Sequence, residues 1–220
     1  MKNDATLTIE AGVEVKFNDG VYLQIGDLLG TGQLIAIGTI TNPITFTSNT
    51  GASPVLWGYI RFTDNSIDTT YDAGGTYNGG STLQYTVIEY AGENSGNFGA
   101  LQIYDSAPFV DHTTIRSNAS RGVYISGGSP KLSDNTIISN TASGNKNGGG
   151  VLISRGAVTL AHNNISGNSA GGQWGAGSNA NATVEYNSLV RNTADSNESW
   201  YSREAKVRWW LYLHLVLNDQ

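Results

Sequence analysis

The sequence predicts an all-β fold, a right-handed parallel β-helix in which short strands and turns coil into about seven or eight stacked rungs. Three observations predict it. Short apolar runs of Val, Ile and Leu, broken by Gly, Asn and Ser, recur along the whole chain. One nine-residue pattern repeats without internal gaps, and a further short strand precedes copies of that pattern at a fixed distance.

The repeated pattern opens with an apolar residue, has a second apolar residue at its sixth position and closes with asparagine. Its four copies are residues 110–118, 132–140, 160–168 and 184–192. The closing asparagines are 22, 28 and 24 residues apart, and an earlier copy at 83–91 ends in alanine instead. Short strands at 101–103, 123–125 and 151–153 precede three copies, each just after a glycine: Gly99, Gly122 and Gly150. Glycine suits a tight corner, so we expect two strands per period on successive sides of a coil.

Stacking of the rungs predicts the role of the asparagines. Equivalent residues of neighbouring rungs lie about 4.8 Å apart along the coil axis. We therefore expect a ladder of hydrogen-bonded amides, made of Asn118, Asn140, Asn168 and Asn192. A second, shorter ladder is expected from Asn135, Asn163 and Asn187.

The solenoid is expected to occupy residues 1–194. Apolar and polar residues alternate over 7–17, and short strand patterns follow at 35–37, 44–46 and 60–62. These patterns extend the solenoid to the N-terminal region. Residues 64–82 form one long Gly-rich loop. Its Asp64, Asp68 and Asp72 are spaced by four, within reach of an oxygen cage for Ca²⁺, although solvated loop carboxylates would look the same. No other cofactor is expected.

Composition limits the function classes. The 220 residues include no cysteine, which excludes disulfides and thiolate chemistry, and 39% of them are apolar, which argues against disorder. The net charge is −6 and the basic residues are scattered singly, so we expect no nucleic-acid partner. No segment before residue 207 has the length of a membrane span.

The same composition is typical of secreted bacterial proteins, so we expect a secreted or cell-surface location. The N-terminal residues Met1 to Ala5 enter strand pattern at once and lack the apolar stretch of a signal peptide. The expectation is therefore that a signal was removed or that the chain is a fragment of a longer protein.

Three segments near the N-terminus, 7–13 (LTIEAGV), 42–48 (NPITFTS) and 57–60 (WGYI), resemble those of secreted bacterial β-helix repeat proteins. With the repeat, the likeness to the pectate-lyase-like right-handed parallel β-helix superfamily covers roughly residues 5–194. That superfamily includes lyases, hydrolases, epimerases, adhesins and surface proteins. The resemblance implies the fold and favours contact with carbohydrate, but does not indicate a reaction.

The resemblance also implies what a lyase would need. In lyase members, Ca²⁺ or an amide neutralises the uronate carboxylate and an Arg or Lys abstracts the α-proton. The outward column that could supply carboxylates is Gln84, Asp111, Ser133, Ala161 and Glu185, whose acids are separated by two rungs without ligands. Arg116 and Arg121 lie in adjoining columns. The lyase pattern is not matched.

A second outward column consists of Tyr85, His112, Asp134, His162 and Tyr186. His112, Asp134 and His162 are candidates for a metal site or proton relay. The two histidines are two rungs, about 10 Å, apart, however, so a polar, solvent-facing bend is the favoured interpretation. Aromatic side chains that could stack on sugar rings are Tyr85, Tyr104, Tyr124 and Trp174.

Residues 195–220 depart from the repeat. Three of the five tryptophans, Trp200, Trp209 and Trp210, lie there, and apolar residues alternate through 207–217. The segment either caps the open end of the coil, or forms a self-association surface, or is a non-native terminus.

Taken together, the residues predict a secreted β-helix module with a surface, adhesion or carbohydrate-contacting role and no identifiable catalytic site. The alternative is a polysaccharide lyase or glycoside hydrolase acting along the face that runs from Tyr85 to Tyr186.

Overall fold

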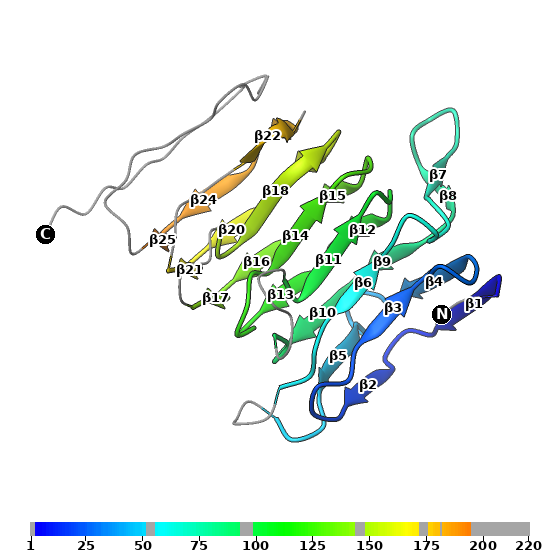
Figure 1. Cartoon of the computed structure of the whole chain (residues 1–220), viewed down its shortest axis with the longest axis horizontal. Coiled ribbons are helices and arrows are strands. Elements are labelled where there is room, and N and C mark those ends of the chain that lie inside the picture. The colour runs from blue at the N-terminus through cyan, green and yellow to red at the C-terminus, as the bar shows by residue number, and fades with distance from the viewer. Residues whose placement is uncertain are drawn as a thin grey trace, which may run out of the picture.

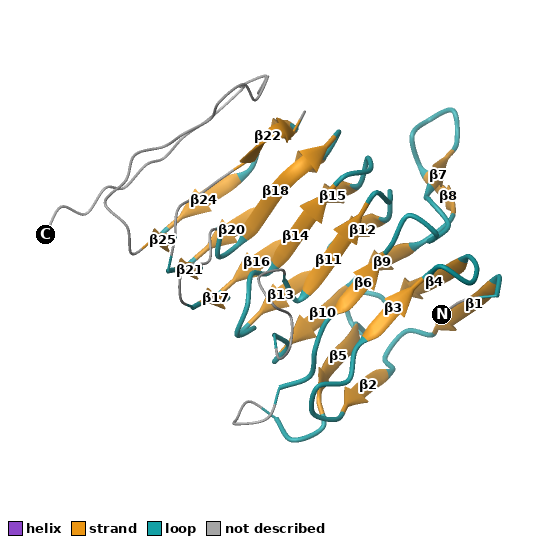
Figure 2. Ribbon diagram, in the orientation of Figure 1, coloured by secondary structure: helices purple, strands orange, loops and turns teal. Residues whose placement is uncertain are grey.

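The computed structural model describes residues 3–51, 56–92, 99–143, 148–171, 176–180 and 182–194. Over these residues the chain coils into a stack of rungs, and strands of successive rungs lie side by side (Figure 1). The described residues contain strands, turns and bends but no helix (Figure 2). None of them forms a helix able to cross a membrane. Trp174 and the segment 195–220, including 207–217, lie outside the described residues.

Three long parallel sheets form the sides of the coil. The first sheet, in spatial order, contains β1 (Ala5–Ile9), β4 (Gly32–Ile37), β9 (Thr82–Gln84), β12 (Phe109–Asp111), β15 (Lys131–Ser133), β19 (Thr159–Ala161) and β23 (Thr183–Glu185). The second contains β2 (Glu14–Phe17), β5 (Ile44–Ser48), β10 (Thr86–Glu89), β13 (Thr114–Arg116), β16 (Thr136–Ile138), β20 (Asn164–Ser166) and β24 (Ser188–Val190). The third contains β3 (Leu23–Ile25), β6 (Ile60–Phe62), β11 (Leu101–Tyr104), β14 (Val123–Ser126), β18 (Val151–Gly156) and β22 (Ala176–Ala180).

The seven strands of the first and second sheets confirm the predicted parallel solenoid and its number of rungs. The expectation of two strands per period was wrong, because most rungs have three. Each nine-residue copy is divided by a residue with positive φ, for example His112 at +46°, which turns the chain from the first sheet into the second. Tyrosine, histidine and aspartate all occur at this bend position with positive φ. Only the place within the repeat, and not one residue type, therefore marks the left-handed residue in the sequence.

The core is built from stacked columns of apolar side chains, one or two per sheet. In-register pairing aligns Leu83, Val110, Leu132 and Leu160 in the first sheet and Ile88, Ile115, Ile137 and Ile165 in the second. These side chains are at most 6% exposed. Because side chains alternate along a strand, the residues on either side of each apolar position face outward.

Both predicted asparagine ladders are present. The first ladder runs from Asn118 through Asn140 and Asn168 to Asn192. The side-chain oxygens of the last three each accept hydrogen bonds from the Nδ2 atom and the backbone N–H of the asparagine one rung earlier. The second ladder links Asn135, Asn163 and Asn187 in the same way. It continues toward the N-terminus through the hydroxyls of Thr113 and Thr86, which lie 3.0 Å apart.

The short strands β17 (Thr141–Ala142), β21 (Ser169–Ala170) and β25 (Thr193–Ala194) stack just after the first ladder. In the 64–82 segment, Ser66 still forms a parallel bridge with Gly32 and so belongs to the coil. The loop that departs from the coil therefore begins after Ser66. It then forms an antiparallel hairpin from β7 (Thr70–Tyr71) and β8 (Tyr77–Gly79), which projects from the stack beside β9 (Figure 1).

Candidate functional site

The bend between the first and second sheets carries a continuous file of polar and aromatic side chains. We call it the bend column; its members are Tyr85, His112, Asp134, His162 and Tyr186, as the sequence predicted. Each member has a φ between +46° and +57°. The backbone N–H of each of the first four donates a hydrogen bond to the next rung, at 3.0–3.1 Å, so the bends stack in register. Five aligned, non-glycine residues in the left-handed region form a regular edge along the solenoid.

Aromatic rings pair along this edge. The rings of Tyr85 and His112 stack with centroids 4.6 Å apart and an interplanar angle of 22°. The rings of His162 and Tyr186 stack at 5.1 Å and 6°. Asp134 occupies the rung between the two pairs. Tyr186 is 68% exposed, so it offers an open ring face to solvent.

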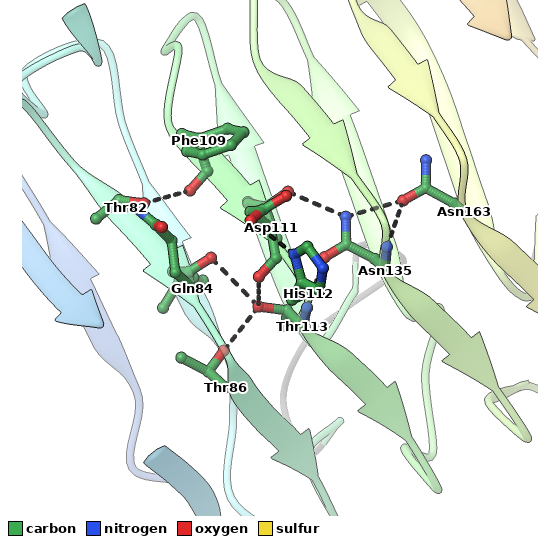
Figure 3. Close-up of polar contacts among 11 residues, drawn as sticks. Thr82, Gln84, Thr86, Phe109, Asp111, His112, Thr113, Asn135 and Asn163 are labelled. Atoms are coloured by element: carbon green, nitrogen blue, oxygen red, sulfur yellow. Dashed lines mark hydrogen bonds and ion pairs between the residues drawn. The ribbon is translucent and has the colours of Figure 1, made fainter. Parts of the chain in front are cut away.

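An acidic residue from the neighbouring column joins the first ring pair. Asp111 Oδ2 lies 2.8 Å from His112 Nδ1, and Figure 3 shows the two side chains turned toward each other. One ligand atom from each of Asp111, His112 and Asp134 lies within 4.8 Å of the other two. Among the described residues, this is the grouping of at least three potential metal-ligating side chains that the fold brings together.

The sequence places Asp111 in a separate column, whose acidic residues are too far apart to act together. The separation along that column holds, since Asp111 and Glu185 are separated by the Ser133 and Ala161 rungs. The left-handed turn at His112, however, brings the imidazole back beside its own neighbour. In the sequence, Asp111 directly precedes His112, a member of the bend column. An acidic residue directly before a member of that column is a signal that could have found the cluster.

On the other side of Asp111 lies a second group of side chains, three aromatic and one basic. We call it the hairpin cluster; its members are Tyr71, Tyr77, Phe109 and Lys131. Phe109 packs against Tyr71 edge-to-face at 5.7 Å and stacks with Tyr77 at 6.2 Å. The Lys131 ammonium lies 5.4 Å from the ring centroids of both Tyr71 and Phe109. Phe109 and Asp111 both project outward from β12, so the hairpin cluster and the bend column border one strip of surface.

The local electrostatics of this strip appear in Tyr71. Burial, with a smaller contribution from the negative charge of Asp111, raises the pKa of the Tyr71 phenol to about 12. The Tyr71 phenol therefore keeps its proton to a higher pH than a free tyrosine does.

The other predicted sugar-binding aromatics lie elsewhere. Tyr104 and Tyr124 contact each other at 5.7 Å on β11 and β14, in the third sheet. Arg61 reaches over the Tyr104 ring from β6. The structure therefore does not gather Tyr104 and Tyr124 with Tyr85 on a single face.

The three predicted Ca²⁺ ligands are not brought together among the described residues. Asp68 accepts a hydrogen bond from the backbone of Ala107 at 2.6 Å, and Asp72 accepts two from its own turn at 2.9 Å. Asp64 instead lines a shallow hollow of about 360 Å³ beside the exposed Leu28 and Leu29. Each carboxylate thus has a separate local environment.

The basic residues considered for lyase chemistry are not part of the strip. Arg116 forms an ion pair with Glu89 at 2.8 Å on the second sheet. Arg121 is 4% exposed, and burial lowers its pKa. The strip therefore offers the carboxylates of Asp111 and Asp134, two imidazoles, aromatic rings and the ammonium group of Lys131.

Comparison with protein families supports the architecture. The family model described as a right-handed beta helix region matches residues 12–193. The chain belongs to the right-handed β-helix family. Comparisons with curated proteins and with solved structures gave no significant match. The match covers all the residues of the bend column and of the hairpin cluster, so the candidate site is built on the repeat of this right-handed β-helix protein.

Proposed function

We propose that this β-helix protein is a secreted or surface-located, carbohydrate-contacting module that binds a glycan chain along the strip between the hairpin cluster and the bend column. The observation that carries the proposal is the pair of ring stacks, Tyr85–His112 and His162–Tyr186, aligned on one edge with Asp134 between them. Aromatic rings offer a platform for the C–H face of a sugar ring, and carboxylates accept hydrogen bonds from its hydroxyls.

The geometry suits an extended ligand. Successive members of the bend column are related by one rung, about 4.8 Å, so the edge presents a regular series of contacts. The rigid backbone that supports the column, with its in-register hydrogen bonds, lowers the entropic cost of ordering a binding surface.

Affinity electrophoresis and calorimetry against neutral, acidic and amino-bearing polysaccharides test the proposal. Tyr186→Asn removes the exposed ring but keeps a residue that tolerates the left-handed conformation. We expect binding to weaken at least about tenfold in this variant, as for the loss of a contact worth about 1.4 kcal/mol. Tyr22→Asn is the matched control, because Tyr22 is also exposed and ring-stacked but lies near β3 on the third sheet. Equal binding by wild type and Tyr186→Asn would reject the proposal.

A second candidate, glycoside hydrolysis, is favoured by one specific observation. Asp111 and Asp134 place carboxylate oxygens within 4.8 Å of each other. Retaining glycosidases use two carboxyl groups about 5–5.5 Å apart. A reducing-sugar assay on the polysaccharides that bind distinguishes the candidates. Turnover that disappears in both Asp111→Asn and Asp134→Asn, with binding retained, would replace the binding-module proposal by an enzymatic one.

A further inference from the structure

The cluster beside the ring stack has the composition of a metal-binding site. We propose that Asp111, His112 and Asp134 bind one divalent transition-metal ion, with Zn²⁺ as the preferred ion. The three side chains come from the end of β12 and from the equivalent bend one rung later. An imidazole nitrogen with two carboxylates is a donor set for Zn²⁺, whereas Ca²⁺ favours oxygen donors alone.

The separations suit such an ion after small side-chain movements. Ligands about 2.0 Å from a tetrahedral metal are roughly 3.3 Å from one another. The Asp111–His112 contact is 2.8 Å, and all three ligand atoms lie within 4.8 Å. His112 and Asp134 are exposed, so their side chains can rotate, and the Tyr85 ring stacks on the imidazole and limits its orientations.

An independent observation concerns Ser133. Among the described residues its hydroxyl has no hydrogen-bond partner, and the residue is only 6% exposed. Ser133 is the in-register partner of Asp111 on β15, so both side chains leave the same face of the first sheet, and it directly precedes Asp134. A buried hydroxyl without a partner is costly, and this one belongs to a residue that neighbours both carboxylate residues, Asp111 across the sheet and Asp134 along the chain. A metal ion with its bound water would give that hydroxyl a partner.

The repeat itself supplies a control site. His162 occupies the same position of the bend, with φ +57° and a stacked tyrosine, Tyr186. Within the described residues, His162 is not part of a group of three ligand side chains within 4.8 Å. An ion that binds to any exposed histidine would bind at both His112 and His162, whereas the proposed site requires His112 alone.

Isothermal titration calorimetry of the full chain, stripped with EDTA, tests the site with ZnCl₂ and, for comparison, with CaCl₂. We expect one Zn²⁺ per chain and weaker binding of Ca²⁺. His112→Asn keeps a residue suited to positive φ and removes the imidazole. We expect His112→Asn and Asp134→Asn each to weaken Zn²⁺ binding at least about 100-fold, since even outer-sphere losses cost 10–100-fold. His162→Asn is expected to leave the affinity unchanged.

Co²⁺ provides a second, spectroscopic measurement. Its visible absorption reports direct ligation, and we expect the band to be present with wild type and His162→Asn and absent with His112→Asn. Circular dichroism before titration verifies that each variant is folded. Absence of Zn²⁺ binding to wild type, undiminished binding in folded His112→Asn, or equal losses in the two histidine variants would each overturn the proposal.

Discussion

The side-chain oxygen of Asn168 accepts two hydrogen bonds from Asn140, one from the backbone N–H at 3.0 Å and one from Nδ2 at 2.9 Å. Nδ2 of Asn140 also donates to the Ile115 carbonyl at 3.0 Å. The side-chain amide of Asn140 therefore bonds to polar groups of the rung before it and of the rung after it, in a corner where Asn140 is fully buried. Buried groups of this kind are expensive to leave unpaired.

Asn140→Ala is therefore expected to destabilise the protein by roughly 2–4 kcal/mol, because several buried groups lose partners at once. The midpoint of urea unfolding, followed by circular dichroism, measures the change. Asn49→Ala is the control, since the side chain of Asn49 is exposed and donates to the exposed side chain of Asn18. This variant should change stability by less than about 0.5 kcal/mol. Similar losses in the two variants would contradict a structural role for the ladder.

Gly150 illustrates a different constraint at the next corner. A Cβ atom added there would lie 2.7 Å from Ile165 Cγ2 and 3.0 Å from Asn168 Nδ2, in the core and in the ladder. We expect Gly150→Ala to destabilise by about 1–3 kcal/mol through overpacking. Gly74→Ala in the hairpin turn, whose nearest contact is a flexible carboxylate, should be close to neutral in the same unfolding experiment. A neutral Gly150→Ala variant would mean that the corner can relax.

These two corners also show which features the sequence could predict. The repeat spacing was sufficient to predict the fold, both amide ladders and the corner glycines, because stacked rungs force equivalent positions into contact. The cluster around His112 was only half predicted. Its assembly depends on the left-handed backbone at His112, a conformation that histidine adopts more readily than most residues but that the residue type alone does not specify.

Asp111 shows why the repeat spacing alone did not predict the rest of the cluster. Counting residues assigns Asp111 to one column and His112 to the next. When each column is considered separately, the contact between these two side chains is not predicted. The three-dimensional bend brings Asp111 to 2.8 Å from the imidazole. The hairpin cluster was missed for a similar reason, since Tyr71 and Tyr77 reach Phe109 from a loop with its own local pairing.

The left-handed backbone at the bend is itself testable. His162 is exposed and has φ +57°, a region that β-branched residues enter at a cost of about 1–2 kcal/mol. His162→Val is expected to destabilise by about that amount, whereas His162→Gly should be neutral or nearly so. Chemical denaturation of both variants measures the difference. Equal stability of the two would indicate that the bend does not hold this conformation in solution.

The last prediction concerns alkaline pH. The phenol of Tyr71 has its pKa raised from 10.0 to about 12, first by burial and then by the charge of Asp111. The unfolded chain loses this proton near pH 10 while the folded chain keeps it, so the free energy of unfolding is retained below pH 10 and falls between about pH 10 and 12. Denaturation at several pH values should show a smaller loss over this range in Tyr71→Phe. Asp111→Asn should reduce the loss only in part, since it removes the lesser cause and leaves the Tyr71 ring partly buried. An unchanged slope in Tyr71→Phe would show that other groups dominate the alkaline transition.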